Sequence, residues 1–504
     1  MKQRLKRAVS CLMLCALLAG CLTVPAAAAG GFADVPSNHW AASSIRQCVE
    51  LGLFRGETAD RFGVGRQMTR GAFAVVLCRF FGWETPAPAE STFPDVPADT
   101  WYAGAVEAAC DHGAITRQSE NFRPGEAITR EELAVMLVRA LGYGTIAGLA
   151  QELPVPFRDV DTNAGYIAVA YRLGLVSGTS ATTFSPEKTA PREQVAVMLM
   201  RLHQRLHQTA REKTGIISGP EGLTDLTGYA AVAVDAGKLV YTGRAQLTAS
   251  MSQEDLRAVR AAAESAGVKQ LLYVSGSANP LKAPAAETAA TLAAAVSEGG
   301  WDGLFLDAAK LKEYSQERQL TALASALRAA LGDKLLYVAA EAPVWRGTSY
   351  KGYDYAALGR SADRLVLRMA PYSEEVNGFP MAPQDPLEEI YYALSQLQGT
   401  VDAEKLSLML TATGSAWKGK SRAGSVTAEE IAALLAEEGT EDYYSSRYAC
   451  AYLQGGGQQQ GTVVWYLNGR AVEERVSLAG FFGVDQVCLS DLGSVSGEVR
   501  TALR

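Results

Sequence analysis

The chain has 504 residues, of which 48% are hydrophobic and 20% charged, and its formal net charge is −7. This composition is typical of globular domains and excludes a disordered or fibrous protein. An acidic chain without a basic cluster does not predict binding to nucleic acid or to an anionic membrane surface. The length predicts three or four domains.

The first 29 residues have the three parts of a secretory signal. Basic residues from Lys2 to Arg7 precede an apolar run, and an alanine-rich cleavage region follows it. We therefore expect a signal peptide over residues 1–29 and a secreted protein. The stretch Leu18–Cys21 resembles a lipobox and leaves open a lipoprotein anchored through Cys21. No later stretch is apolar over the roughly 20 residues that a transmembrane helix needs.

Beyond the signal, the cysteines are odd in number and form no Cys-x-x-Cys pair. They are Cys48, Cys78, Cys110, Cys450 and Cys488. This pattern predicts neither a disulfide framework nor a zinc site, and we expect no metal and no cofactor. Cys48, Cys78 and Cys110 fall in apolar helical patterns, where buried thiols are the expected state. A bridge between Cys48 and Cys78 within one repeat is the alternative.

One pattern occurs three times in the following part of the chain, which predicts a modular array. Each copy opens with Phe-x-Asp-Val and continues to an aromatic residue, a helix that ends at a glycine, a loop with one phenylalanine, and a second helix with an arginine at its start. The aspartates are Asp34, Asp95 and Asp159; the glycines Gly52, Gly113 and Gly174; the loop residues Phe62, Phe122 and Phe184; the arginines Arg70, Arg130 and Arg192.

These repeats resemble the S-layer homology (SLH) family over residues 30–84, 91–145 and 155–207. The resemblance implies an all-α helical pseudo-trimer at the cell surface, whose grooves bind secondary cell-wall polysaccharide that carries pyruvyl groups. A pyruvyl ketal is a carboxylate, which an arginine beside a helix N-terminus is suited to bind. The family's contacts carry over to Asp34, Trp40, Arg70, Asp95, Trp101, Arg130, Asp159 and Arg192.

Two points stay open within this resemblance. The aspartates are equally suited to cap the first helix of each repeat. The third repeat departs from the pattern, because Tyr166 stands near the tryptophan position and Ala190-Pro191 replaces the usual Ile-Thr. Its groove is expected to bind poorly or to serve only the helix bundle.

Residues 208–224 are rich in glycine, and we interpret them as a linker. From residue 225 to 504, short β-branched or aromatic runs alternate with alanine-rich helices, which predicts parallel strands in an α/β fold. The expected strands are 229–234, 271–274, 303–306, 335–339, 364–369, 406–410 and 487–489, and the expected helices 253–266, 285–298, 317–330, 386–397 and 428–437. With an eighth strand between Val240 and Gln246, this segment suits one (β/α)8 TIM-type barrel.

The stretch Trp301–Ala309 resembles the fourth-strand signature D-G-x-x-x-D-x-E of glycoside hydrolase family 18. Stretches 353–367, 405–408 and 463–475 are similar to the branch of that family that acts on spore peptidoglycan. The resemblance implies substrate-assisted cleavage of amino-sugar glycans. The glutamate of the signature protonates the leaving oxygen, and its middle aspartate orients the acetamido group.

The departures from this signature predict a retired active site. Asp302 and Asp307 are kept, but Ala309 occupies the glutamate position and cannot donate a proton. The M-x-Y-D element is broken after Tyr372, and Ser490 aligns with the tryptophan that floors the sugar pocket. Glu341 is the alternative acid, although a solvated loop charge is the simpler interpretation of it, as it is of Glu374 and Glu375.

Three functions are therefore weighed. The first is a surface-anchored protein whose non-catalytic barrel binds peptidoglycan or a chitin-like glycan, or acts as a scaffold, with glycan contacts from Asp307, Trp345, Tyr372 and Trp417. The second is an active amino-sugar glycan hydrolase that uses Asp307 and an unorthodox acid. The third is a structural component of an S-layer lattice.

Overall fold

The computed structural model describes residues 31–503 except 118–119, 153–154, 208–211, 223–224, 276–280, 310, 345–350, 370–382, 384, 420 and 446–447. The chain divides into two compact units. The first comprises Met1–Ala140, Pro156–Asn163 and Leu175–Leu202, and the second comprises Leu141–Val155, Ala164–Gly174 and His203–Arg504.

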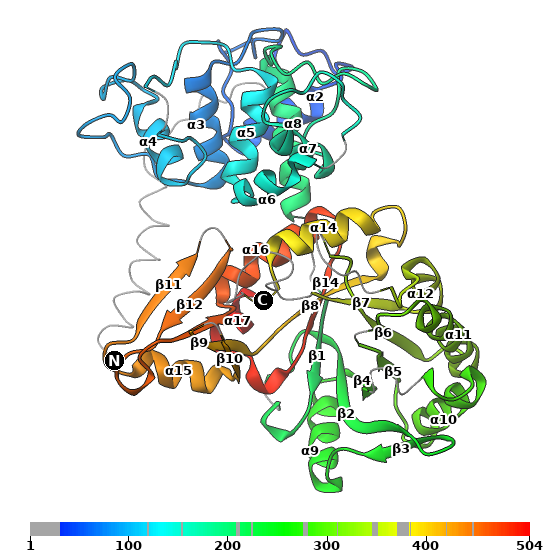
Figure 1. The fold of residues 1–504 in the computed structure, drawn as a ribbon. Helices are drawn as coiled ribbons and strands as arrows, with labels where there is room; N and C mark the ends of the chain where they lie inside the picture. Colours follow the sequence, from blue (N-terminus) through cyan, green and yellow to red (C-terminus); the bar gives the residue numbers. More distant parts are fainter. Residues whose placement is uncertain are drawn as a thin grey trace. The chain divides into compact units, whose positions relative to one another are not determined.

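The first unit is helical, as the repeats predict. Its helices, coloured blue to green in Figure 1, are α2 (Ala42–Glu50), α3 (Arg70–Phe81), α4 (Ala103–Asp111), α5 (Arg130–Ala140) and α8 (Arg192–His207). Thr69 caps α3 by accepting the Ala72 amide, and Thr129 and Glu132 form the expected capping box at α5. The glycines that follow α2 and α4 lie at φ of +70° and +73°, the left-handed position that ends a helix.

The three repeats close into a ring through backbone hydrogen bonds before their second helices. The Met68 amide donates to the Ala190 carbonyl (3.0 Å), the Ile128 amide to Met68 (2.8 Å), and the Ala190 amide to Ile128 (3.1 Å). Each repeat thus donates to one neighbour and accepts from the other. Because all three bonds lie within one chain, a single molecule completes the pseudo-trimer that the SLH resemblance implies.

The cysteines of this unit do not pair. The Cys48 thiol donates to the Ala196 carbonyl and the Cys78 thiol to the Ala105 carbonyl. The alternative of a Cys48–Cys78 bridge is therefore wrong, and all five cysteines after the signal are free and buried. Burial raises the pKa of both thiols to about 12, so they lie in the protonated form at neutral pH.

The second unit contains an eight-stranded parallel barrel. Its strands are β1 (Glu212–Ile217), β2 (Tyr229–Tyr241), β4 (Lys269–Ser275), β5 (Gly303–Asp307), β6 (Leu335–Glu341), β7 (Arg364–Arg368), β8 (Leu406–Leu410) and β14 (Gln486–Leu489). They pair in this order, and β14 and β2 both pair with β1 to close the ring. Inward side chains such as Leu271, Phe305, Val366 and Met409 fill the interior.

Two sequence interpretations were wrong at the start of this barrel. The eighth strand is β1, which lies in the presumed linker, whereas residues 240–246 belong to a hairpin of β2 with the antiparallel strand β3 (Ala245–Ala249). Gly215 suggested a linker, but a side chain there would come within 2.5 Å of Leu492. This glycine lies in a strand because the chain packs closely against it.

Helices surround the barrel (Figure 1). They are α9 (Gln253–Ser265), α10 (Ala285–Glu298), α11 (Tyr314–Leu331), α12 (Tyr355–Ser361), α14 (Leu387–Leu397), α16 (Gly469–Phe481) and α17 (Gly497–Ala502). Of these, α9, α10, α11 and α14 lie close to predicted positions, whereas α12, α16 and α17 were not predicted. The second unit also includes α6 (Gly144–Leu149) and α7 (Ala164–Arg172). None of the helices within the described residues is long and apolar enough to cross a membrane.

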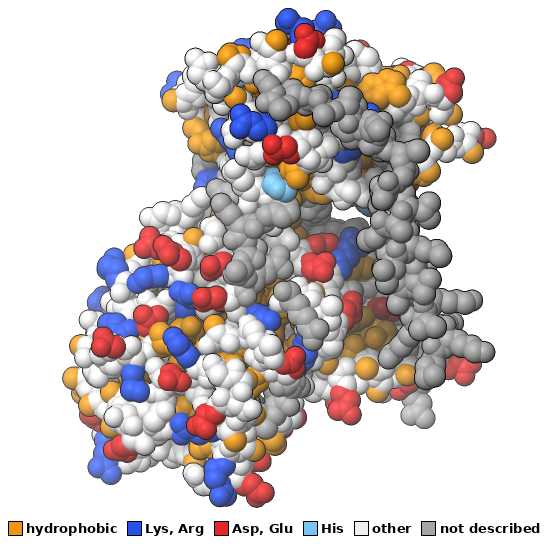
Figure 2. Space-filling view, turned by 180° about the vertical axis from the view of Figure 1, so that it is seen from behind, with side chains coloured by type: hydrophobic (Ala, Val, Ile, Leu, Met, Phe, Trp, Pro, Cys, Tyr) orange, Lys and Arg blue, Asp and Glu red, His pale blue; other side chains and the backbone are white. Residues whose placement is uncertain are grey.

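A second sheet, which the sequence did not predict, is inserted between β8 and α16. It is antiparallel and consists of β9 (Gly414–Lys418), β10 (Ser421–Val426), β11 (Glu441–Ser445), β12 (Cys450–Gln454) and β13 (Thr462–Tyr466). The helix α15 (Ala428–Ala436) packs Ile431 against the Leu453 and Val464 side of this sheet. Over this unit, Figure 2 shows acidic and basic side chains interspersed on the surface.

Candidate functional site

Each arginine of the repeats lies on the phenylalanine of the next repeat. The guanidinium carbon of Arg70 is 4.8 Å from the Phe122 ring centroid, that of Arg130 is 4.6 Å from Phe184, and that of Arg192 is 4.9 Å from Phe62. In each pair the arginine Nε also donates to the carbonyl of the same phenylalanine. This cation–π contact and hydrogen bond hold each guanidinium at the boundary between two repeats.

The three opening aspartates hold these phenylalanine loops. Asp34 accepts the amides of Phe62, Gly63 and Val64, and Asp95 and Asp159 each accept two amides of the corresponding loops. The aspartates therefore do not cap the first helices of the repeats, as the alternative proposed. Burial tends to raise the pKa of Asp34, but the three amide donors outweigh burial and lower it.

Two of the repeat boundaries are hollowed into grooves. One, of about 250 Å³, is lined by Arg70, Phe122, Arg123 and Glu132. The other, of about 370 Å³, is lined by Arg130, Lys188, Arg201 and Trp40. Trp40 is 62% exposed, so the first repeat supplies an open ring to the groove between the second and third repeats. Trp101 is 69% exposed and offers a second open ring.

The carboxyl ends of the barrel strands carry a buried ion-pair cluster. Arg368 at the end of β7 binds Asp307 at the end of β5, and its Nη1 lies 3.4 Å from Oε1 of Glu341 at the end of β6. The Tyr273 hydroxyl also donates to Asp307. Burial tends to lower the pKa of Arg368, but the charges of Asp307 and Glu341 outweigh burial and raise it, so the guanidinium stays charged.

The structure places the other family 18 residues as follows. Asp302 precedes β5 and accepts the Gln270 amide, so it lies at the opposite end of the strand from Asp307. Ala309 follows Asp307 by two residues and is half-buried. Glu341 is 3% exposed and ends β6, so its interpretation as a solvated loop charge was wrong.

Sequence reasoning missed Asp235, Tyr273 and Arg368. Asp235 follows the inward-facing Ala231 and Ala233 on β2, and burial raises its pKa. The signal available was a titratable residue at or near the end of several strands, because carboxyl ends of parallel strands meet at one face of a barrel. The ion pairs and the hydrogen bond of the Asp307 cluster join side chains on β4, β5, β6 and β7. No spacing in the sequence indicates that these side chains lie together.

The other expected glycan contacts are only partly placed. Trp345 and Tyr372 lie outside the described residues, as do Glu374 and Glu375. Trp417 is half-buried on β9 of the second sheet, whereas Asp307 ends a barrel strand. Ser490 follows β14, and its hydroxyl accepts the Ala412 amide.

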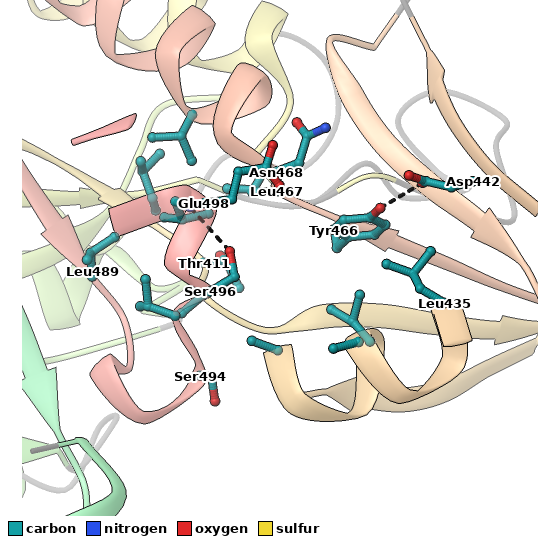
Figure 3. Close-up of a pocket in the computed structure, with 18 residues that line it drawn as sticks. Thr411, Leu435, Asp442, Tyr466, Leu467, Asn468, Leu489, Ser494, Ser496 and Glu498 are labelled. Carbon is teal, nitrogen blue, oxygen red and sulfur yellow. Dashed lines mark hydrogen bonds between the residues drawn. The ribbon is translucent and has the colours of Figure 1, made fainter. Parts of the chain in front are cut away.

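A separate hollow of about 220 Å³ lies between the second sheet and the barrel (Figure 3). The Tyr466 hydroxyl points into it and donates to Asp442 over 2.7 Å. Asn468 and Glu498 line it together with apolar residues such as Leu435. It shares no lining residue with the Asp307 cluster.

No three His, Cys, Asp or Glu side chains in the described part of the chain are placed to hold a metal ion. A general acid must carry a proton, whereas an arginine within ion-pair distance favours the ionised form of a carboxylate. In the Asp307 cluster, Arg368 pairs with both Asp307 and Glu341 within the barrel.

We expect the variant Arg368→Ala to lose about 3–5 kcal/mol of unfolding free energy at neutral pH, because Asp307 and Glu341 would be buried without a counter-ion. Denaturant unfolding at neutral pH measures this loss. The control Arg470→Ala removes an exposed pair with Glu474 and should cost under about 1 kcal/mol. An equally small loss at Arg368 would contradict the assignment.

Comparison with known proteins agrees with both units. The model of the S-layer homology domain matches residues 31–74, 92–134 and 156–196. An S-layer protein of Bacillus thuringiensis subsp. finitimus is 29% identical over 38% of this chain and 23% of its own length. An endoglucanase of Bacillus sp. (strain KSM-635) is 28% identical over 47% of this chain and 27% of its own length. The chain thus spans about a quarter of the curated relatives it matches.

The second unit has the fold of known chitinases. A chitinase from Chromobacterium violaceum superposes with a TM-score of 0.52 at 21% identity, covering 58% of this chain and 98% of its own. The model of glycosyl hydrolases family 18 matches residues 206–480, which include all barrel strands up to β8. With three SLH domains ahead of this barrel, the chain belongs to glycosyl hydrolase family 18.

Proposed function

We propose that this protein is held non-covalently at the cell surface by its SLH domains, which bind acidic secondary cell-wall polysaccharide. The barrel then acts as a glycan-binding or scaffold domain and not as a hydrolase. In this proposal residues 30–84, 91–145 and 155–207 form the anchor. The signal peptide over 1–29, and the alternative lipid anchor at Cys21, remain predictions on residues outside the described part of the chain.

The anchoring role is supported mainly by the position of the repeat arginines at the boundaries between repeats. Each guanidinium is fixed by a neighbouring repeat, so little side-chain entropy is lost when a ligand binds. A guanidinium fork matches the geometry of a carboxylate, which a pyruvyl ketal supplies on an otherwise neutral sugar. The open Trp40 ring gives the sugar an apolar face to stack on.

The non-catalytic role is supported by the residues at the expected reaction centre. Ala309 offers no proton, and Arg368 neutralises the carboxylates of Asp307 and Glu341. General acid catalysis contributes about 10²–10⁴-fold to such reactions. A barrel of this shape still suits binding of peptidoglycan or a chitin-like glycan. The persistence of Asp307 and Glu341 at strand ends is what favours the alternative of an active hydrolase.

The anchoring role predicts that the full chain sediments with purified cell walls and stays in solution after the secondary polysaccharide has been extracted. Arg130→Ala should weaken the binding free energy for the wall by about 1–3 kcal/mol, because it removes a charged contact to the polymer. Arg117→Ala, which removes an exposed pair with Asp111, is the control and should bind as the parent does. Equal retention on extracted walls would refute the role.

The non-catalytic role predicts no release of reducing sugar when the full chain is incubated with N-acetylglucosamine polymers or peptidoglycan. Release that is lost in Glu341→Gln but kept in Asp302→Asn would establish the hydrolase alternative instead. Asp302 is a suitable control because it lies at the other end of β5 from Asp307.

A further inference from the structure

The boundaries between the three SLH repeats, together called the SLH unit, are built in the same way but differ at one residue position. In each, an arginine lies on the phenylalanine of the next repeat. The residue that differs stands two positions after the arginine of that next repeat. It is Glu132 opposite Arg70, Gln194 opposite Arg130, and Ala72 opposite Arg192.

The groove at Arg70 already contains a carboxylate. Glu132 lies 2.6 Å from Nη1 of Arg70 and 2.7 Å from Nη2 of Arg123. Both arginines therefore face an acid of the protein itself. An anionic ligand must displace Glu132 or bind beside it, and either costs part of the charge attraction.

The groove at Arg130 contains no such acid. Arg130, Lys188 and Arg201 line it, and none of its lining residues is acidic. Gln194, at the position of Glu132, is neutral. Nε of Arg130 donates to the Phe184 carbonyl and its Nη2 to Ser177, so its bonds in the protein are to neutral carbonyls.

At the third boundary, Ala72 adds no charge, but other acids surround Arg192. Its Nη2 donates to the Arg55 carbonyl, and Glu57 binds the neighbouring Arg66 at 3.1 Å. The buried Glu193 accepts the Gly65 amide in the same region. The positive charge at this boundary is thus partly balanced within the protein.

We propose that the wall polymer binds chiefly in the groove between the second and third repeats, and that Gln194 determines this choice because it leaves Arg130 without an acid among the residues that line its groove. The inference rests on the proposed anchoring role. The ligand class is a carboxylate-bearing saccharide, whose acid binds Arg130, Lys188 and Arg201 while a sugar ring stacks on Trp40.

Two reciprocal, nearly isosteric substitutions in the full chain test the proposal. Gln194→Glu places an acid in the Arg130 groove and should raise the Kd for pyruvylated wall polysaccharide about tenfold to a hundredfold. Glu132→Gln removes the acid from the Arg70 groove and should lower the Kd a few-fold. The glutamine oxygen can still accept the Thr129 amide, so the helix cap is kept. Gln253→Glu on the barrel makes the same change of charge and should have no effect.

The outcomes separate this inference from the anchoring role. If the parent chain does not bind the polymer, the anchoring role is refuted. If the parent binds and Gln194→Glu binds equally well with an unchanged melting temperature, the groove assignment is overturned. It is also overturned if Gln253→Glu weakens binding as much, because the effect is then one of net charge. Polymer stripped of its ketals should bind the parent and Gln194→Glu alike.

Discussion

The SLH unit depends on one repeated contact, an arginine held on the phenylalanine of the next repeat. The contact joins the repeats and at the same time places a guanidinium where two repeats meet. Because each repeat gives its arginine to the following one and the third gives its own to the first, the ring closes within a single chain. Removing one arginine would weaken both the ring and a binding surface.

The barrel combines a closed fold with an ion-pair cluster at the carboxyl ends of its strands. Its strands, register and interior packing are those of a closed parallel barrel. At the carboxyl ends, Arg368 occupies the space between Asp307 and Glu341 with a fixed positive charge. A buried ion pair of this kind adds little net stability over apolar packing, but it is costly to break. Loss of one member would therefore leave a buried charge unpaired, whereas the intact cluster holds both carboxylates in ion pairs.

Much of this architecture follows from local sequence. The helix Ala285–Glu298 was predicted at its observed bounds, since Pro284 precedes it and alanines favour it. The strand β1 was missed because Gly215 suggested a linker, although it lies under Leu492. The second sheet was missed because strands such as Glu441–Ser445 are largely exposed and lack an apolar run. The placement of Trp40 and Arg130 in one groove and the ion pair of Arg368 with Asp307 depend on closure of the fold and have no local signal.

In the proposed binding mode, a sugar carboxylate binds a guanidinium that the neighbouring repeat holds, and one groove contributes most of the affinity. Isothermal titration calorimetry of the full chain with a short wall-polymer fragment bearing one pyruvyl ketal tests this mode most directly. We expect one tight site per chain, which Arg130→Ala weakens and Arg70→Ala leaves unchanged. Three equivalent sites, or tight binding that survives Arg130→Ala, would contradict this binding mode.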